Sequence, residues 1–180
     1  IIGDTGTASK AQNEVGAQME AYRQKFAFDF VIMVGDNLYG GQSPKDFVSK
    51  FEAPYQAMLN AGVRFYAALG NHDDPGQRNY RQFNMNGERY YTFRPGASAL
   101  GKVFGSNVRF FALDSNYMDK AQIDWLEKEL AGSASDWKIC FFHHPPYGSA
   151  RFHGSSDDLG AAVEPLFVKY GVSVVFTGHD

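Results

Sequence analysis

Short apolar runs that stop at a glycine or a polar residue recur along this chain, and they predict buried β-strands. The clearest examples are the run 30–34, which stops at a Gly-Asp pair, and the run 63–69, which stops at a Gly-Asn pair. The predicted strands are 1–2, 30–34, 63–69, 90–93, 103–104, 108–113, 137–142 and 172–176. The segments 90–93 and 103–104 are short, and we expect them to form antiparallel strands.

Segments between these runs carry apolar residues at helical spacing. The predicted helices are 10–26, 44–60 as one helix or two, 119–132 and 158–170, with a short one around Tyr80. Ser43 and Pro44 mark the start of the second helix, and Pro165 either kinks the last helix or begins it. The first helix would bury an apolar stripe made of Val15, Met19, Tyr22 and Phe26. Strands alternating with helices indicate an α/β fold in one domain over 1–180.

Composition and charge exclude several classes of function. The 180 residues carry a net charge of -3 and no basic run, so no nucleic acid partner is expected. No apolar stretch reaches the roughly 18 residues of a membrane-spanning helix. Cys140 is the only cysteine, which predicts a buried strand residue rather than an internal disulfide. The chain opens without Met, from which we expect that its natural N-terminus has been removed.

The predicted strands deliver polar side chains at the points where they end. Because the carboxyl ends of parallel strands meet at one edge of a sheet, we expect these side chains to converge. Their oxygen and imidazole donors suit Fe, Mn and Zn. Two such cations about 3.5–4 Å apart, sharing a carboxylate, can hold both a hydroxide and a phosphate. The converging set is Asp4, Asp36 with Tyr39, Asn71 with His72, His143 with His144, and His179.

Simpler interpretations exist for each of these residues. Asp4 and Asp36 could be helix caps or turn residues, which often follow a strand. Tyr39 could be a packed aromatic. Of the histidine pair, the position relative to the following prolines favours His143 as the ligand and leaves His144 a supporting role. Asp114, at another strand end, is interpreted as a turn or supporting residue.

Five short motifs follow one another along nearly the whole chain. They are Asp4-Thr5-Gly6, Gly35-Asp36-Asn37-Leu38-Tyr39, Gly70-Asn71-His72-Asp73, His143 before Pro145, and Gly178-His179. In this order they resemble the motifs of the calcineurin-like metallophosphoesterases, and most closely the purple acid phosphatases of the small tartrate-resistant type. Two features favour that branch: Gly6 stands where most members carry a His ligand, and Tyr39 is present. Exchange of imidazole for phenolate favours Fe(III).

The resemblance implies a fold and a cofactor. The fold would be a four-layer αββα metallophosphoesterase sandwich. The cofactor would be a binuclear metal centre, with Fe(III) in one site and a divalent Fe, Zn or Mn ion in the other. The implied ferric ligands are Asp4, Asp36 and Tyr39, and the implied divalent ligands are Asp36, Asn71, His143 and His179.

The resemblance also implies a reaction, the hydrolysis of phosphate monoesters by a metal-bound hydroxide, as in an acid phosphatase. His72 would bind the phosphate, and His153 would protonate the leaving alcohol. The spacing of His153 from the His143 motif differs from the family's by about one residue, so His153 could instead be an exposed loop residue. The substrate would be a phosphate ester, the pH optimum acidic, and the location secreted or otherwise extracytoplasmic by family habit.

Two other functions remain open at this point. One is a phosphodiesterase or nucleotidase of the same superfamily that uses Mn or Zn. The other is a phosphate-binding module without turnover. The family's last motif reads Gly-His-x-His, whereas this chain ends at Asp180. We therefore expect an incomplete domain that lacks one ferric ligand and the later strands. Neither the natural substrate nor the oligomeric state follows from the sequence.

Overall fold

The computed structural model describes residues 1–95, 107–135, 137–150 and 153–179. The predicted strand at 103–104 lies outside these residues. The strands are β1 Phe30–Val34, β2 Arg64–Ala68, β3 Tyr91–Phe93, β4 Val108–Ala112, β5 Trp137–Phe141 and β6 Val174–Phe176. The α-helices are α1 Lys10–Arg23, α2 Pro44–Phe47, α3 Gln56–Asn60, α5 Lys120–Ala131 and α6 Asp157–Tyr170. Shorter helical turns are η1 Val48–Glu52, η2 Pro75–Asn79 and η3 Arg81–Phe83.

The strands form two sheets. In the first, β1 pairs with β2 in parallel, and a parallel bridge from Ile2 to Met33 extends the sheet on the other side of β1. In the second, the order is β3-β4-β5-β6, with β3 antiparallel to β4 and the others parallel. The last residues of β1 and β2, Val34 and Ala68, are register partners. The residues that follow them therefore emerge side by side, as the sequence pattern predicts.

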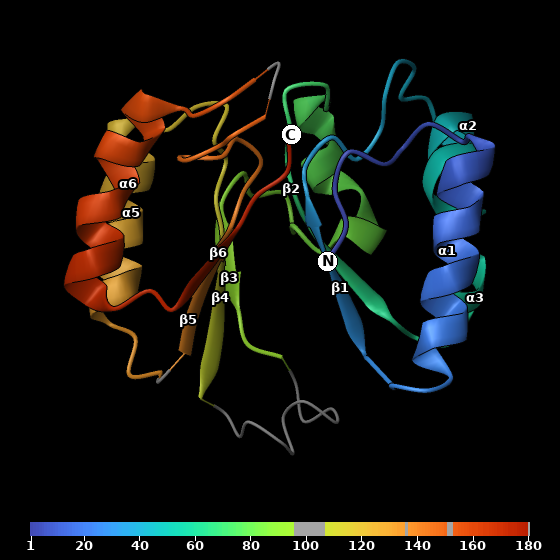
Figure 1. Cartoon of the computed structure of the whole chain (residues 1–180), viewed down its shortest axis with the longest axis horizontal. Coiled ribbons are helices and arrows are strands. Elements are labelled where there is room, and N and C mark those ends of the chain that lie inside the picture. The colour runs from blue at the N-terminus through green and yellow to red at the C-terminus, as the bar shows by residue number, and fades with distance from the viewer. Residues whose placement is uncertain (96–106, 136, 151–152, 180) are drawn as a thin grey trace.

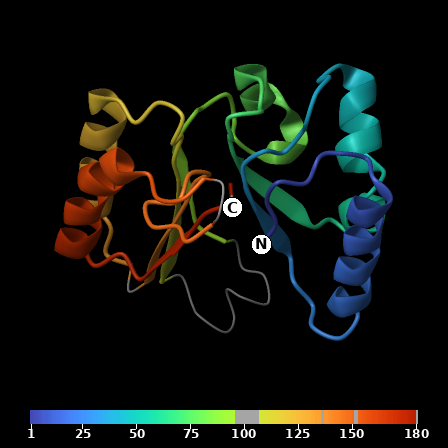
Figure 2. The same ribbon diagram turned by 45° about the horizontal axis from the view of Figure 1, so that its top comes forward.

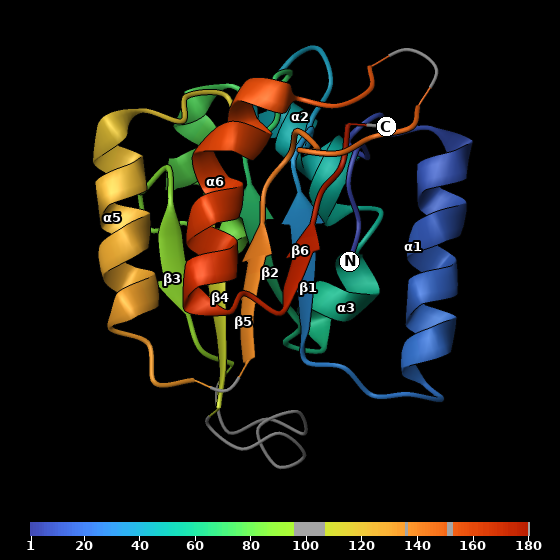
Figure 3. The ribbon, with the colours of Figure 1, turned by 60° about the vertical axis from the view of Figure 1, so that its left-hand side comes forward.

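Helices cover the outer face of each sheet, and the two sheets face each other (Figure 1). α1, α2 and α3 lie outside β1 and β2, whereas α5 and α6 lie across β3 to β6 (Figure 3). The main apolar core joins the sheets through contacts such as the Tyr66 ring of β2 stacked on the Phe93 ring of β3, with centroids 3.7 Å apart. On the outer face of β2, Phe65 packs on Phe51 and Tyr55. A second core, including Leu126, Val163 and the buried Cys140, fixes α5 and α6 to their sheet.

The first helix is placed differently from the prediction. α1 ends at Arg23 rather than at 26, and three of the four predicted stripe residues are largely exposed: Val15 by 46%, Tyr22 by 59% and Phe26 by 62%. The stripe is wrong because α1 packs through Gln12 and Gly16, its buried residues. A Cβ at Gly16 would lie 2.2 Å from the Pro54 carbonyl oxygen, so the glycine permits a close backbone approach that hydrophobic spacing does not reveal.

The other elements follow the prediction with shifts at their ends. The segment 44–60 divides into α2, η1 and α3, with the Ser43 N–H and hydroxyl both donating to Asp46. The polar stretch around Tyr80 forms the turns η2 and η3, with Tyr80 between them. α6 runs through Pro165, which therefore does not begin it. Within the described residues, no helix is long and apolar enough to span a membrane.

Candidate metal centre

The loop after β1 places Asp36 at the middle of the site. Gly35 and Asp36 both have positive φ angles, 94° and 49°, and a Cβ at Gly35 would lie 2.6 Å from His143 Nδ1. Only glycine lets the loop pass this ring. The Asp36 side chain is 2% exposed; its Oδ1 accepts the His72 backbone N–H at 3.0 Å, and its Oδ2 accepts the Tyr39 hydroxyl at 2.9 Å.

Asp4 and Tyr39 lie on one side of this carboxylate. The Tyr39 hydroxyl is also 3.3 Å from Asp4 Oδ1, so a phenol oxygen lies between two carboxylates. Burial, and then the charges of Asp36 and Asp4, raise the pKa of the Tyr39 phenol above its usual value. Asp4 is exposed and has a φ of 52°, and its backbone N–H donates to the Gly35 carbonyl. This group is made entirely of oxygen donors.

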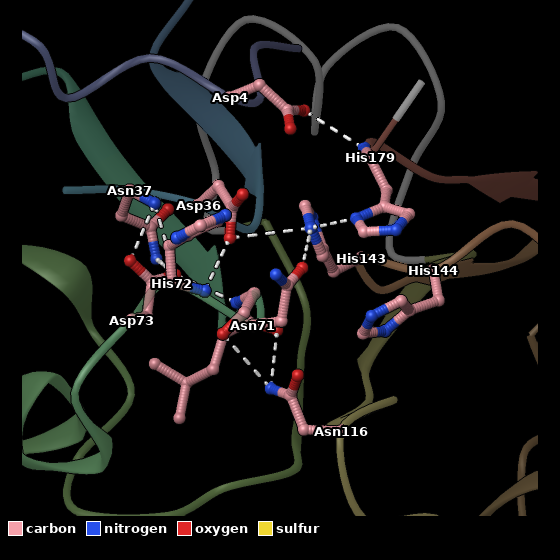
Figure 4. Close-up of polar contacts among 12 residues, drawn as sticks. Asp4, Asp36, Asn37, Asn71, His72, Asp73, Asn116, His143, His144 and His179 are labelled. Atoms are coloured by element: carbon pink, nitrogen blue, oxygen red, sulfur yellow. Dashed lines mark hydrogen bonds and ion pairs between the residues drawn. The ribbon is translucent and has the colours of Figure 1, made fainter. Parts of the chain in front are cut away.

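Asn71, His143 and His179 lie on the other side. His143 Nε2 is 3.1 Å from Asn71 Oδ1, 3.0 Å from His179 Nδ1 and 3.4 Å from Asp36 Oδ1. His143 Nδ1 lies 3.0 Å from the Val34 carbonyl oxygen. Because a carbonyl can only accept, a proton on Nδ1 would pair with Val34, and Nε2 would then be free to bind a cation. Figure 4 shows these side chains pointing toward one another.

His179 connects the two sides. Its backbone N–H donates to Asp4 Oδ2 at 3.0 Å, while its ring faces His143. Residues near the two ends of the described chain therefore meet at the site. Figure 2 shows the two groups of helices on opposite sides of the two sheets. Burial, followed by the neighbouring His143 and His153, lowers the pKa of His179. A neutral imidazole is the form that binds a metal ion.

The two predicted catalytic histidines flank this group. The exposed His72 ring lies 4.9 Å from the Tyr39 ring, and the exposed His153 ring lies 4.2 Å from the His179 ring. All eight predicted site residues are thus brought to one region. Their roles as ligands or proton donors stay predictions.

His144 lies closer to the site than the sequence suggested. Its ring is 4.5 Å from the His179 ring, and its Nδ1 is 2.9 Å from Ser115 Oγ. Burial, followed by the charges of His143 and His179, lowers the pKa of His144 to about 4. The signal available in the sequence was only its place beside His143. Sequence reasoning did not anticipate its approach to His179, because that depends on how β6 sits against β5.

A second residue was not singled out by the sequence. Asp73 accepts hydrogen bonds from N–H groups of both the Asp36 loop and the Asn71 loop, and Figure 4 shows it below Asn37, with dashed lines joining the two residues. Burial raises the pKa of Asp73, while the N–H donors around it oppose that rise. In the sequence, the only indication of this role was that Asp73 ends the motif Gly70-Asn71-His72-Asp73. Asn116 also supports the Asn71 loop, because its side-chain amide donates to the Gly70 carbonyl oxygen at 3.2 Å.

The donor set fits a pair of cations. The ligand atoms of Asp4, Asp36 and His143 lie within 4.8 Å of one another, as do those of His143, His144 and His179. No Lys or Arg forms an ion pair with either Asp4 or Asp36 among the residues described. Carboxylates held together at a sheet edge without a cationic side chain repel each other, and a metal ion relieves this.

Comparison with known proteins places the chain in a family. The model of the calcineurin-like phosphoesterase family matches residues 1–180. The chain belongs to this family. It is 26% identical over 212 aligned residues to tartrate-resistant acid phosphatase type 5 of Mus musculus, covering 99% of this chain and 64% of the relative. Purple acid phosphatase 7 of Arabidopsis thaliana is also 26% identical, with 100% of this chain and 62% of the relative covered.

Two solved structures share the fold. GAP50, the anchor in the inner membrane complex of Plasmodium, has a TM-score of 0.75 at 19% identity, covering 99% of this chain and 64% of its own. A dimetal phosphatase from Danio rerio has a TM-score of 0.63 at 17% identity, covering 94% and 70%. The predicted resemblance is therefore confirmed at the level of family and fold. Identity this low, over under two thirds of the mouse and Arabidopsis relatives, does not establish the reaction.

Proposed function

We propose that this protein hydrolyses phosphate monoesters with a pair of metal ions. The observation that carries the proposal is the position of Asp36, whose two carboxylate oxygens face different groups of donors. One oxygen faces Tyr39 and the other faces His143. A carboxylate placed in this way can bridge two cations.

The residues divide into two ligand sets. Asp4, Asp36 and Tyr39 would hold a hard cation, for which Fe(III) is proposed, because phenolate and carboxylate are hard donors. Asp36 would also hold the second, divalent ion, for which Fe, Zn or Mn is proposed, together with Asn71, His143 and His179. When bound, such a pair neutralises phosphate charge and makes a strong nucleophile available near neutral pH.

The flanking histidines would complete the site. His72 is exposed and lies beside Tyr39, which suits a ring that donates a hydrogen bond to a phosphate oxygen. His153 is exposed and lies beside His179 on the opposite flank, which suits a ring that gives a proton to the departing alcohol. Proton donation to the leaving group matters because alkoxide departure is part of a very high barrier.

The test combines metal analysis, visible absorption and two chromogenic substrates, 4-nitrophenyl phosphate and bis(4-nitrophenyl) phosphate. We expect iron with a divalent ion, faster hydrolysis of the monoester, and a phenolate-to-iron band that disappears in Tyr39→Phe. Tyr147→Phe is the matched control, because Tyr147 is 70% exposed and bonds to Glu164 away from the site. It should keep the band.

Each alternative has its own result in this experiment. Faster hydrolysis of the diester by colourless protein holding Mn or Zn would replace the proposal with a phosphodiesterase or nucleotidase. Phosphate binding without turnover of either substrate would indicate a non-catalytic module. Absence of bound metal after reconstitution with iron, zinc and manganese would end the proposal.

A further inference from the structure

We infer that Asp73 is a positioning residue for the candidate metal centre. Its carboxylate holds the Asp36 loop and the Asn71 loop at a fixed separation. The inference rests on the metal centre that the proposed function uses. Asp73 itself belongs to neither group of candidate ligand atoms. Its effect would reach the metal ions through the backbone of the two loops.

The first set of contacts runs from Asp73 to the Asp36 loop. The Asn37 backbone N–H donates to Oδ1 at 2.8 Å and to Oδ2 at 3.1 Å, and the Leu38 backbone N–H donates to Oδ1 at 3.0 Å. The Asn37 side-chain amide adds a donor to Oδ2 at 3.0 Å. Because these bonds involve the two residues directly after Asp36, they fix the direction in which the loop leaves β1.

The second set ties the same carboxylate to its own loop and returns to Asp36. The Gly70 N–H donates to Asp73 Oδ2 at 2.8 Å, which closes the turn that presents Asn71. In the reverse direction, the His72 N–H donates to Asp36 Oδ1 at 3.0 Å. Each loop therefore lends a carboxylate to the other loop's backbone, and neither ligand can shift alone without breaking a hydrogen bond.

An outer layer holds Asp73 in turn. Gln77 is 2% exposed, and its amide donates to Asp73 Oδ1 and to Gln42 Oε1, both at 2.8 Å. The Gln42 amide then donates to the His72 carbonyl oxygen at 2.8 Å. This layer closes a ring of hydrogen bonds that returns to the residue after Asn71.

The chemistry of the position requires a carboxylate. Each of these groups that bonds to the Asp73 side chain is an N–H donor, and an ionised carboxylate is a pure acceptor with about four lone-pair sites. An asparagine of the same shape would turn an NH₂ group toward some of these donors, whichever way it is flipped. Backbone N–H groups would lose their acceptor, and the two loops would separate.

The experiment measures metal affinity of Asp73→Asn by calorimetric titration with Mn²⁺, and compares Co²⁺ absorption spectra. We expect Mn²⁺ to bind about 10- to 100-fold more weakly, the range typical for loss of a residue that supports a metal ligand. The Co²⁺ bands should change in intensity as the ligand geometry changes. Asp74→Asn is the matched control: Asp74 is the exposed neighbour, its side chain accepts the Gly76 N–H, and wild-type affinity is expected.

A purely structural role would give a different result. If Asp73→Asn lowers the melting temperature of the metal-free protein but keeps wild-type Mn²⁺ affinity and Co²⁺ spectrum, the inference is overturned. If that variant does not fold, Gln77→Met decides, since it removes the amide of Gln77 and leaves the carboxylate. A few-fold weaker Mn²⁺ binding supports the inference, and unchanged binding overturns it.

The inference and the proposed function can fail separately. A wild-type protein that binds Mn²⁺ but hydrolyses no phosphate ester, with weaker binding in Asp73→Asn, would remove the proposed function and leave the positioning role intact. A phosphatase whose Asp73→Asn variant keeps metal affinity and rate would remove the positioning role alone. A wild-type protein that binds neither Mn²⁺, nor Zn²⁺, nor iron would overturn both.

Discussion

The two halves of the site are held by different means. In the first half, Asp36, Tyr39, Asn71 and His72 lie on two loops joined by backbone N–H groups and the Asp36 and Asp73 carboxylates. The second half is made of His143, His144, His153 and His179, whose rings are mainly in contact with one another. We call them the amide-held half and the histidine half.

The difference follows from the side chains that each pair of strands delivers. The amide-held half follows β1 and β2, which are register partners along their whole length, so its two loops start side by side. The histidine half follows β5 and β6, and β6 is a short strand at the end of its sheet. β5 and β6 are also parallel neighbours, with Phe141 and Phe176 as register partners. The loops after β1 and β2 place carboxylates beside backbone N–H groups, whereas those after β5 and β6 place rings against rings. The comparison teaches that neighbouring strand ends can be connected by shared acceptors or by ring packing.

The largest effect should come from removing the Asp36 carboxylate, which belongs to the amide-held half and also lies 3.4 Å from His143 Nε2 of the histidine half. Asp36→Asn should weaken Mn²⁺ binding by more than about 100-fold, because loss of an outer supporting residue alone typically costs about 10- to 100-fold. Calorimetric titration measures this, with the exposed Asp124→Asn on α5 as control. An affinity within a few-fold of wild type would show that Asp36 does not join the two halves.

Gly70→Ala tests the close fit of the amide-held half. An added Cβ would lie 2.2 Å from both the Asp36 backbone nitrogen and its Oδ1. We expect the free energy of unfolding to fall by about 2–3 kcal/mol, as for other overpacked sites. Gly160→Ala on α6 is the matched control, since its Cβ would make an ordinary contact at 3.7 Å with Pro146. Urea denaturation should show equal stability for the two variants if the close fit is irrelevant.

Within the histidine half, His143→Ala and His179→Ala should differ in metal-free stability. His143 is 0% exposed and bonds to the Val34 carbonyl, whereas His179 is partly exposed. Loss of His143 leaves a buried acceptor unpaired, which costs about 1–3 kcal/mol. We expect His179→Ala to cost less by urea denaturation. If the two variants lose equal free energy of unfolding, His143 and His179 contribute equally to the stability of the histidine half.

The smallest effect concerns the far end of the Tyr39 loop. Lys50 donates to the Tyr39 and Gly41 carbonyls and pairs with Asp46. Hydrogen bonds from Lys50, and then from Ser43, lower the pKa of Asp46 to about 2. A lowered pKa gives stability that is present above the unfolded-state value near 4 and is lost as pH falls toward 2.

The variant Asp46→Asn should therefore lose less stability than wild type between pH 4 and pH 2, measured by thermal unfolding. Lys50→Met should likewise reduce the loss of stability between pH 4 and pH 2, because it removes the main cause of the lowered pKa of Asp46. If wild type and both variants lose the same stability between pH 4 and pH 2, the ion pair between Lys50 and Asp46 does not hold this end of the loop.

The site was more predictable than the packing around it. The order of Gly-Asp, Gly-Asn-His and Gly-His motifs placed Asp36, Asn71 and His179 at strand ends, and parallel pairing then brought them together. The exposed stripe of α1 was predicted wrongly, because Gly16 and Gln12 make the contact and neither is hydrophobic. Periodicity measures which face is apolar, and it does not measure how closely two backbones can approach.

The sequence by itself determined the family, the α/β class and the residues available for a metal site, since these follow from local pattern and motif order. The tertiary structure alone decided which atoms face each other: the approach of His144 to His179, the contact of His143 Nδ1 with the Val34 carbonyl oxygen, and the position of Asp73 between two loops. These depend on contacts between residues 35 to 109 positions apart in the chain. No local pattern encodes such contacts, because they arise only when distant strands pair and the two sheets pack together.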